Sequence, residues 1–302
     1  MPSTQIQWFP GHMAKTRRMI TENLKSVDLI IEILDARIPY SSRNPELSRL
    51  IGNKPTLLLL NKSALADPEK TRLWAEHYRS ETVRCLAIDC LTGEGISRIL
   101  PTVQDILKEK TEKYESCGMA GRRLRAMILG IPNLGKSTLI NKLVGNKKAK
   151  VENRPGVTVD KAWYSTSIGI DLMDMPGLLW PKFEDRIVGE NLAITGAIKD
   201  AILDTEEIAM KLCGRLRALY PSLLLARYPI VKEASELDAF GEFELMEAIG
   251  RRRGCLISGG EVNTERTATL LLDEFRSAKI GRITLEVPAG RSHDKEMTNH
   301  DC

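Results

Sequence analysis

The chain has 302 residues, of which 42% are hydrophobic and 28% charged, with a formal net charge of +4. This composition is that of an ordinary folded protein, and the length exceeds what one hydrophobic core usually organises, so we expect more than one domain. No apolar run approaches the roughly 20 residues of a membrane-spanning helix. The six cysteines are scattered without a Cys-x-x-Cys pair, which argues against a zinc site or a disulfide framework. We therefore expect a cytoplasmic protein with no membrane partner and no cleaved leader.

Strand and helix signals alternate through the first third of the chain. Residues 8–15 (W-F-P-G-H-M-A-K) are too rich in proline, glycine and aromatic residues for a helix interior, and helical periodicity follows to Leu24. Asp67-Pro68 is a helix start, with Asp as cap and Pro at the first position. The alternation predicts a doubly wound, mostly parallel sheet. We expect strands over 28–34, 55–60 and 83–88, and helices over 46–51, from Asp67-Pro68 and from Ile96 to about Lys110.

A phosphate-binding loop is predicted near the middle of the chain. Residues 111–121 collect charge and glycine and are expected to be a linker inside the fold, after which a strand over 124–129 leads into G-I-P-N-L-G-K-S at 130–137. A buried strand, a glycine turn and a helix N-terminus together present backbone N–H groups to an anion. Lys136 would neutralise the β and γ phosphates, and the Ser137 hydroxyl would hold Mg²⁺. The expected phosphate-binding residues of this loop are Asn133, Leu134, Gly135, Lys136, Ser137 and Thr138.

The segment after this loop contains three further residues that are expected to bind the nucleotide or its metal ion. Strands are predicted over 147–152, 162–168 and 170–174, and the last ends in D-M-P-G at 174–177. At that distance from the loop, Asp174 suits the magnesium shell and the Gly177 N–H suits the γ phosphate. Thr158, in the glycine-containing loop between the strands, could complete the Mg²⁺ coordination.

The base-recognition turn stands in an unusual place. GTP-binding domains carry an Asn-Lys-x-Asp turn after a strand, usually downstream of the phosphate loop, yet the only candidate here is Asn61-Lys62-Ser63-Ala64, upstream of it. The turn at 92–95 also matches the later half of such a domain. The simplest account is a circular permutation in which the last three strands come first, which is physically cheap when domain termini lie close together.

Beyond residue 186 the strand signals vanish. Helices are expected over 190–203, 206–219, 243–250 and 264–275, followed by a polar tail. We therefore expect a GTPase domain over 1–184, a helical domain over 185–287 and a disordered tail over 288–302. Because the D-M-P-G segment runs out into the helical domain, tightening on the γ phosphate could move that domain as a lever.

Four motifs and the permuted order give the chain a family resemblance. W-F-P-G-H-M-A-K, D-A-R-I-P-Y-S-S-R-N-P at 35–45, R-G-C-L-x-S-G-G-E and L-L-D-E-F-R-S resemble the ribosome biogenesis GTPase A family, which are circularly permuted bacterial GTPases. The resemblance covers Trp8 to Val287. It implies GTP as substrate, hydrolysis with Mg²⁺, a role in late assembly of the large ribosomal subunit, and a helical domain that docks on ribosomal RNA. We expect the protein to be a monomer.

The resemblance also bears on catalysis. Many GTPases place a water-orienting glutamine after D-x-x-G, whereas this chain has Leu178 and Leu179 there, so intrinsic turnover should be slow. By resemblance, His12 is the candidate catalytic residue, although capping a helix or contacting RNA is an equally open role. Asn133 matches a position associated in related GTPases with a K⁺ ion.

The chain departs from the family at the base. Ala64 stands where the family has the guanine-reading aspartate, and Asp89-Cys90 replaces a small Ser-Ala pair, so guanine preference should be weakened unless Asp67 substitutes. The guanine-binding residues that we expect are Asn61, Lys62, Ser63, Ala64, Asp89 and Cys90.

Two matters stay open at this stage. Basic residues recur through the helical domain and could contact RNA phosphates or simply form solvated helix faces. A nucleotide-sensing scaffold with negligible hydrolysis is an alternative function, while a small-molecule kinase is disfavoured because no acceptor-binding motif is apparent. The basic residues concerned are Arg215, Arg217, Arg251, Arg252, Arg253, Arg276, Lys279 and Arg282.

Overall fold

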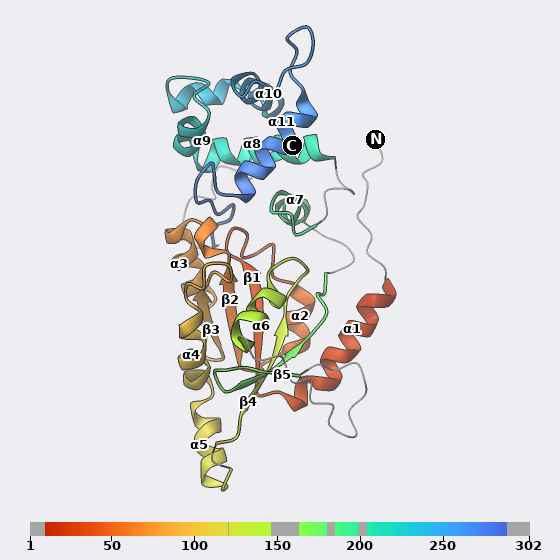
Figure 1. Ribbon diagram of the computed structural model, residues 1–302, viewed down its shortest axis with the longest axis vertical. Coiled ribbons are helices and arrows are strands. Elements are labelled where there is room, and N and C mark those ends of the chain that lie inside the picture. The colour runs from red at the N-terminus through yellow and green to blue at the C-terminus, as the bar shows by residue number, and fades with distance from the viewer. Residues whose placement is uncertain (1–9, 120, 146–162, 180–184, 199–203, 289–302) are drawn as a thin grey trace, which may run out of the picture.

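The computed structural model describes residues 10–119, 121–145, 163–179, 185–198 and 204–288, with side chains from residue 14 onwards. An α/β body and a helical body are stacked along the long axis, and helix α7 (Arg186–Ile194) lies between them (Figure 1). One continuous cluster of buried apolar side chains includes residues of both bodies, such as Ile128 and Leu216. The two bodies therefore share a core.

The α/β body is built on a six-stranded sheet in the order β3-β2-β1-β4-β6-β5. Neighbouring strands are parallel except β5, which is antiparallel to β6. Strands β1 and β2 are buried along their whole length, as expected for parallel strands covered on both faces. The predicted doubly wound sheet is confirmed. The strands are β1 (Leu29–Asp35), β2 (Thr56–Asn61), β3 (Val83–Ala87), β4 (Leu124–Leu129), β5 (Trp163–Ser165) and β6 (Ile170–Asp174).

Helices flank this sheet on both sides (Figure 1). Asp67 caps α3 through the backbone N–H groups of Glu69 and Lys70, as predicted. The expected strand over 147–152 lies outside the described residues. The helices are α1 (Pro10–Asn23), α2 (Pro45–Ile51), α3 (Pro68–His77), α4 (Ile99–Ile106), α5 (Lys108–Ser116) and α6 (Lys136–Val144).

Two local predictions were wrong. The residues P-G-H-M-A-K belong to helix α1. Proline is tolerated in the first turn of a helix because an N–H there would have no helical partner. Residues 111–116 belong to helix α5 instead of an irregular linker. Its Glu and Lys residues are good helix formers, and α5 is anchored because both Lys110 and Tyr114 bind the carboxylate of Asp28.

Among the described residues the helical body has four further α-helices, and one of them was not predicted. Helix α9 is short and begins at Pro221, so its apolar letters give too little periodicity to recognise. Helix α7 begins earlier than expected because Asp185 caps it. None of the helices in the described ranges is long and apolar enough to cross a membrane. The four helices are α8 (Thr205–Leu219), α9 (Pro221–Arg227), α10 (Glu242–Arg252) and α11 (Thr264–Arg276).

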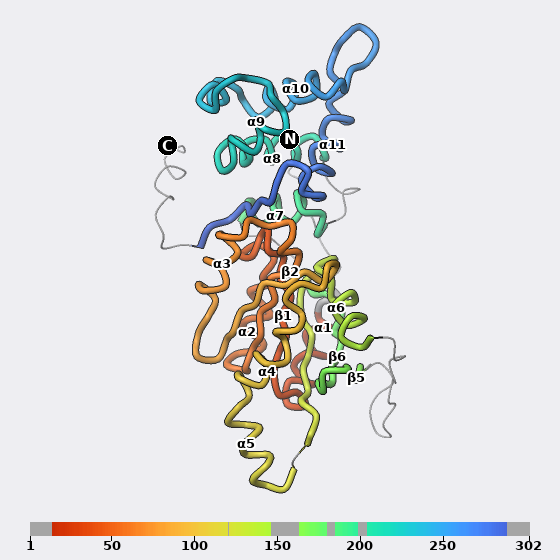
Figure 2. Tube along the Cα trace, turned by 60° about the vertical axis from the view of Figure 1, so that its left-hand side comes forward, coloured from red at the N-terminus to blue at the C-terminus, as the bar shows by residue number. Residues whose placement is uncertain are grey.

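After α11 the chain returns to the α/β body. Figure 2 shows its dark-blue end running along the top of that body beside α3. We call residues 282–286 the C-terminal strap. Thr284 and Leu285 are buried, and the Leu285 N–H donates to the Arg37 carbonyl oxygen at 2.8 Å. The strap belongs in sequence to the predicted helical domain, yet it packs on the α/β body.

One carboxyl group lies inside the sheet without a hydrogen bond. Glu32 on β1 is 1% exposed, and neither of its oxygens has a hydrogen-bond partner. Its nearest cation is Arg43, 3.6 Å from Oε2, and this cation also stacks over Tyr78. Burial outweighs the Arg43 charge and raises the pKa of Glu32 to about 7.

The pH dependence of the free energy of unfolding should reveal the ionisation of Glu32. Because the folded-state pKa lies above that of the unfolded chain, ionising Glu32 destabilises the fold as pH rises from about 4.5 to about 7, by about 3 kcal/mol in total. Urea unfolding at a series of pH values should show that Glu32→Gln makes the decrease smaller by this amount, whereas Glu109→Gln, on the exposed face of α5, leaves it unchanged. The remaining decrease in Glu32→Gln includes that of Glu286, whose pKa burial also raises to about 7. Equal pH slopes for wild type and Glu32→Gln would contradict the assignment.

Candidate nucleotide site

The phosphate loop leaves strand β4 and enters helix α6 through two glycines that have no room for a side chain. A Cβ at Gly130 (φ 148°) would lie 2.7 Å from the Ile33 carbonyl oxygen, and one at Gly135 (φ 97°) would lie 2.6 Å from Nδ2 of Asn61. Gly135 is the N-cap of α6, so the helix directs its N-terminal N–H groups into the loop. The strand, glycine turn and helix predicted for an anion cradle are all present.

Lys136 lies across this loop. Its Nζ donates to the carbonyl oxygens of Gly130 and Ile131 at 3.1 and 2.9 Å. Burial lowers the pKa of Lys136 to about 8, and the nearby Asp174 carboxylate opposes that shift. Phosphate oxygens would replace the two carbonyl oxygens as partners of Nζ, and their negative charge would favour the protonated form of Lys136. On the far side, a Cβ at Gly177 would lie 3.0 Å from Lys136 Nζ, so the D-M-P-G segment closes directly over the lysine.

Asp174 fits the shell of a hydrated cation. It ends β6, which pairs with β4, so it stands beside the phosphate loop. Burial raises the pKa of its carboxyl group against the attraction of Lys136, and its buried Oδ1 has no hydrogen-bond partner. Ser137 lies exposed in the first turn of α6. Thr158 lies outside the described residues.

The donor set suits Mg²⁺ held mostly by substrate. Within the described ranges there is no group of three or more His, Cys, Asp or Glu residues that could hold a metal ion by itself. Mg²⁺ is commonly bound by one or two protein oxygens together with phosphate oxygens and water. Asp174 and Ser137 provide that partial set.

Asn61 joins the upstream turn to the phosphate loop. Its Nδ2 donates to the Leu134 carbonyl oxygen at 2.6 Å, and its Oδ1 accepts the Cys90 N–H at 2.9 Å. A single buried side chain thus holds together three loops that are far apart in sequence. The permuted order places the base-recognition turn beside the phosphate cradle, as predicted.

Lys62 is held in position by a carboxylate that the sequence did not single out. Lys62 adopts φ 63°, and its Nζ lies 3.0 Å from Oδ2 of Asp35. Asp35 also binds the Arg37 guanidinium at 2.8 Å. Burial would raise the pKa of Asp35, but the Arg37 and Lys62 charges outweigh it and hold the pKa below its usual range. Asp35 therefore stays ionised and fixes the lysine of the base-recognition turn.

The base-recognition turn has a carboxylate near Ala64, but it comes from the neighbouring loop. Oδ1 of Asp89 accepts the N–H groups of Leu91 and Thr92, and Oδ2 lies 3.4 Å from the Ala64 N–H. Asp67 caps α3 with Oδ1 and accepts the Tyr220 hydroxyl with Oδ2 at 3.0 Å. Asp67 is thus committed to packing, and Asp89 is the carboxylate that borders position 64.

The residues after D-M-P-G point into the core. Leu178 and Leu179 are 2% and 3% exposed, so neither can face an attacking water. The Leu178 N–H donates to the Gly130 carbonyl oxygen at 3.3 Å, and its own carbonyl oxygen accepts Nδ2 of Asn44 at 2.8 Å. Asn44, which sequence reasoning missed as a site residue, anchors this segment. His12 lies in the first turn of α1, and its side chain is outside the described part of the chain.

Four of the arginines that could contact RNA phosphates are hydrogen-bonded to other groups of the protein. Arg215 binds Asn191 and Glu190, and Arg217 donates to the Phe240 carbonyl oxygen. Arg276 donates to the carbonyl oxygens of residues 193 and 194, and Arg282 to those of residues 63 and 66. These hydrogen bonds leave the four arginines fewer donors for an RNA phosphate. Arg251, Arg252 and Lys279 are exposed, as are Arg253, which binds Glu274, and Arg282.

Comparisons with known proteins agree with this geometry. A family model described as "50S ribosome-binding GTPase" matches residues 125–213. Two solved structures are similar over the whole fold. A GNP-bound YlqF from Thermotoga maritima is 27% identical with a TM-score of 0.60, covering 91% of this chain and 99% of that one. A GDP-bound YlqF is 26% identical with a TM-score of 0.61, covering 90% and 99%.

Curated relatives match almost end to end. The Ribosome biogenesis GTPase A of Bacillus pumilus is 45% identical over 283 residues, which are 94% of this chain and 99% of that protein. That of Priestia megaterium is 47% identical over 285 residues, 94% of this chain and 97% of that protein. Together with the phosphate loop, the permuted sheet and the Asn61 bridge, this similarity shows that the chain belongs to the ribosome biogenesis GTPase A family and is a GTPase.

Proposed function

We propose that this GTPase acts in late assembly of the large ribosomal subunit, as a cytoplasmic monomer whose nucleotide state is coupled to docking of its helical body on ribosomal RNA. The nucleotide half of the proposal is carried by the Asn61 bridge, which brings the base-recognition turn to the phosphate loop. The ribosomal half is supported by the relatives, which are named for ribosome biogenesis, and by the family model, which describes a 50S ribosome-binding GTPase.

The residues divide the work of binding and hydrolysis. The loop N–H groups and Lys136 bind the phosphates, and the Gly177 N–H contacts the γ phosphate. Asp174, with Ser137 and the undescribed Thr158, would hold Mg²⁺, which neutralises charge on the β and γ phosphates. The unpartnered Oδ1 of Asp174 supports this assignment.

Water activation needs help from outside the D-M-P-G segment. Because Leu178 and Leu179 are buried, turnover of the free protein should be slow. We propose that His12 orients or activates the water and that a K⁺ ion at Asn133 adds positive charge. Asn133 adopts φ 61° and donates through Nδ2 to the Ala197 carbonyl oxygen at 3.2 Å, so Oδ1 is its cation-binding atom.

The turn after α7 provides a route from nucleotide to helical body. Its carbonyl oxygens accept hydrogen bonds from Asn133 of the phosphate loop and from Arg37 beside the base-recognition turn, and the adjoining last residue of α7 accepts one from Arg276 of α11. A shift of the phosphate loop on GTP binding would therefore reach α11 through one turn. This route supplements the expected lever, whose residues 180–184 are outside the described part of the chain.

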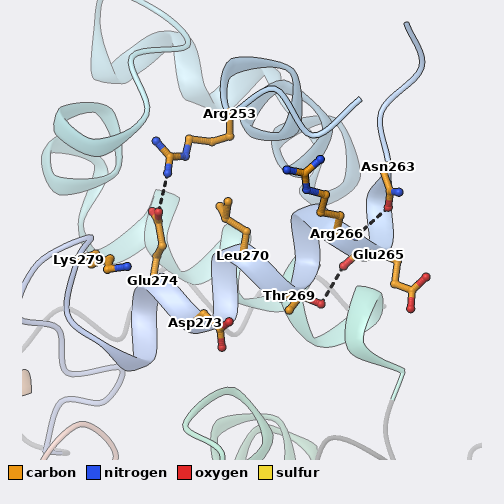
Figure 3. Close-up of a pocket in the computed structure, with 9 residues that line it drawn as sticks. All are labelled: Arg253, Asn263, Glu265, Arg266, Thr269, Leu270, Asp273, Glu274 and Lys279. Carbon is orange, nitrogen blue, oxygen red and sulfur yellow. Dashed lines mark hydrogen bonds and ion pairs between the residues drawn. The ribbon is translucent and has the colours of Figure 1, made fainter. Parts of the chain in front are cut away.

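The RNA-docking surface is best placed at the free end of α10. A groove of about 640 Å³ beside α11 mixes basic and acidic side chains, with Arg253 bound to Glu274 at 2.8 Å (Figure 3). Its mixed charge makes it a poor phosphate site. Arg251 and Arg252 are exposed in the last turn of α10, where the following loop projects away from the α/β body (Figure 1). Such a cationic end suits a polyanion.

A second candidate is a nucleotide-sensing scaffold with negligible turnover. The buried Leu178 and the missing acid at Ala64 favour it. Subunit-stimulated phosphate release separates the two functions, because a scaffold would show none.

Restoring the acid that is missing at position 64 is predicted to increase the affinity for GDP. Ala64→Asp should tighten GDP binding, because a carboxylate reading the guanine N–H groups adds charge-assisted hydrogen bonds, by about tenfold in Kd. The neighbouring Asp89 carboxylate should repel the new acid, so Ala64→Asp combined with Asp89→Asn should bind more tightly still, since asparagine keeps the Oδ1 acceptor. Calorimetry with GDP and XDP measures this. No gain in either variant would place the base elsewhere.

The cation proposal predicts a K⁺ dependence. In the presence of large ribosomal subunits, GTP turnover should be about tenfold faster in K⁺ than in Na⁺. Asn133→Ala should abolish the difference, whereas Asn53→Ala, on the exposed turn after α2, should leave it unchanged. Phosphate release at matched ionic strength is the measurement, and equal rates in the two salts would refute a K⁺ site.

The docking surface predicts a change in salt dependence. If Arg251 and Arg252 each neutralise a phosphate, replacing both with glutamine should lower the slope of log Kd against log salt by about two for binding to purified large subunits. Arg79→Gln, on the exposed surface after α3, should leave the slope unchanged. An unaltered slope in the double variant would move the RNA interface to another face.

A further inference from the structure

The base-recognition turn is held from behind by the other end of the chain. Arg282 donates through Nε to the Ala66 carbonyl oxygen and through Nη2 to the Ser63 carbonyl oxygen, both at 2.9 Å. One guanidinium thus spans the 3₁₀ turn between residues 63 and 66. The fixed fork of arginine donors is suited to such a two-point contact.

Other strap residues complete this contact. The Ile283 N–H donates to the Leu65 carbonyl oxygen at 3.1 Å, and Oγ1 of Thr284 accepts the Asp67 N–H at 3.2 Å. On its opposite side the turn is bound by the 88–89 segment, through the Ser63 N–H to Ile88 and the Ala64 N–H to Asp89. The backbone of residues 63–67 is therefore enclosed between the strap and the loop that holds Cys90.

The strap is itself anchored to both bodies. Thr284 is fully buried, its Oγ1 donates to the Ala36 carbonyl oxygen, and its N–H donates to the hydroxyl of Tyr220 at the start of α9. The Glu286 carboxylate accepts the N–H groups of Tyr40 and Ser41 and Nδ2 of Asn191 on α7. The strap's position is thus set by the helical body as well as by the sheet.

We propose that Arg282 is a positioning residue of the nucleotide site: through the strap, the C-terminal end of the chain sets the geometry of the base-recognition turn and so the affinity for the guanine base. This inference rests on the proposed GTP site. It adds to that site a residue that lies more than 140 residues downstream of the phosphate loop in sequence. The permuted domain carries its base turn near the N-terminus, and the strap supports that turn from the other end of the polypeptide. Arg282 touches only backbone carbonyls of the turn, so its effect on nucleotide is indirect.

The test separates base binding from phosphate binding. By calorimetry with Mg²⁺, Arg282→Ala should weaken GDP binding about fivefold and leave binding of tripolyphosphate, which lacks the base, unchanged. Arg282→Lys, which can reach one of the two carbonyl oxygens, should give an intermediate GDP affinity. Arg72→Ala is the matched control. Arg72, on α3, lines the same surface pocket as Arg282, but it pairs with Glu76.

Three outcomes are decisive. A GDP affinity equal to wild type in Arg282→Ala overturns the inference, as does an equal loss of GDP and tripolyphosphate binding, which would mean general loosening of the fold. Thermal unfolding of each variant accompanies the titrations. Thr284→Val, which keeps the volume but removes the hydrogen bonds of Oγ1 with Asp67 and Ala36, should reproduce the selective loss. If the wild-type protein itself does not bind GDP, that result contradicts the proposed nucleotide site, and it is distinguished from the other two outcomes because no variant is needed to see it.

Discussion

The structure depends on one amide side chain. Asn61 uses both of its polar atoms to bind the phosphate loop at Leu134 and the loop after β3 at Cys90. A buried amide whose nitrogen and oxygen both have a partner restricts its neighbours to one arrangement, since displacing them leaves a donor or an acceptor unsatisfied. Because the three loops come from separate parts of the chain, this bridge is what turns a rotated sequence order into one nucleotide site.

The permutation also explains what lies around the site. Helices α4 and α5 connect β3 to β4, with α5 at the end of the sheet far from the helical body, while the chain after β6 continues to the helical body (Figure 1). The chain then comes back through the C-terminal strap to the base-recognition turn. The phosphate side contacts the helical body through Asn133 and the α7 turn, and the base side contacts it through Arg282. Both ends of a bound nucleotide thus have a path to the helices.

Local patterns made much of this predictable. The strand before Gly130, the glycine spacing and Lys136 lie within a few residues of one another, so their geometry follows from the sequence. The doubly wound, mostly parallel sheet followed from the alternation of strands and helices, and the Asp67 cap followed from the adjacent Asp67 and Pro68. Helix α5 was missed because its helicity comes from propensity and from the distant Asp28, and not from an apolar face.

Long-range contacts could not be predicted in the same way. Asp35 and Asn44 stand in a motif that marks the family, yet their roles appear only when Lys62 and Leu178 are placed beside them. The arginines of the helical domain show the same limit. Arg276 and Arg282 cannot be told apart from Arg251 by sequence, and only the fold shows that they bind backbone carbonyl oxygens. A charged residue's role depends on partners that its own neighbourhood in sequence does not contain.

The most direct test of the account is the affinity of Asn61→Ala for GDP, measured by calorimetry on protein shown to be folded. If Asn61 assembles the site, the Kd should rise about 100-fold, because two loop contacts and the base-side geometry are lost together. A Kd within about twofold of wild type would contradict the claim that this bridge joins the phosphate loop and the base-recognition turn into one site.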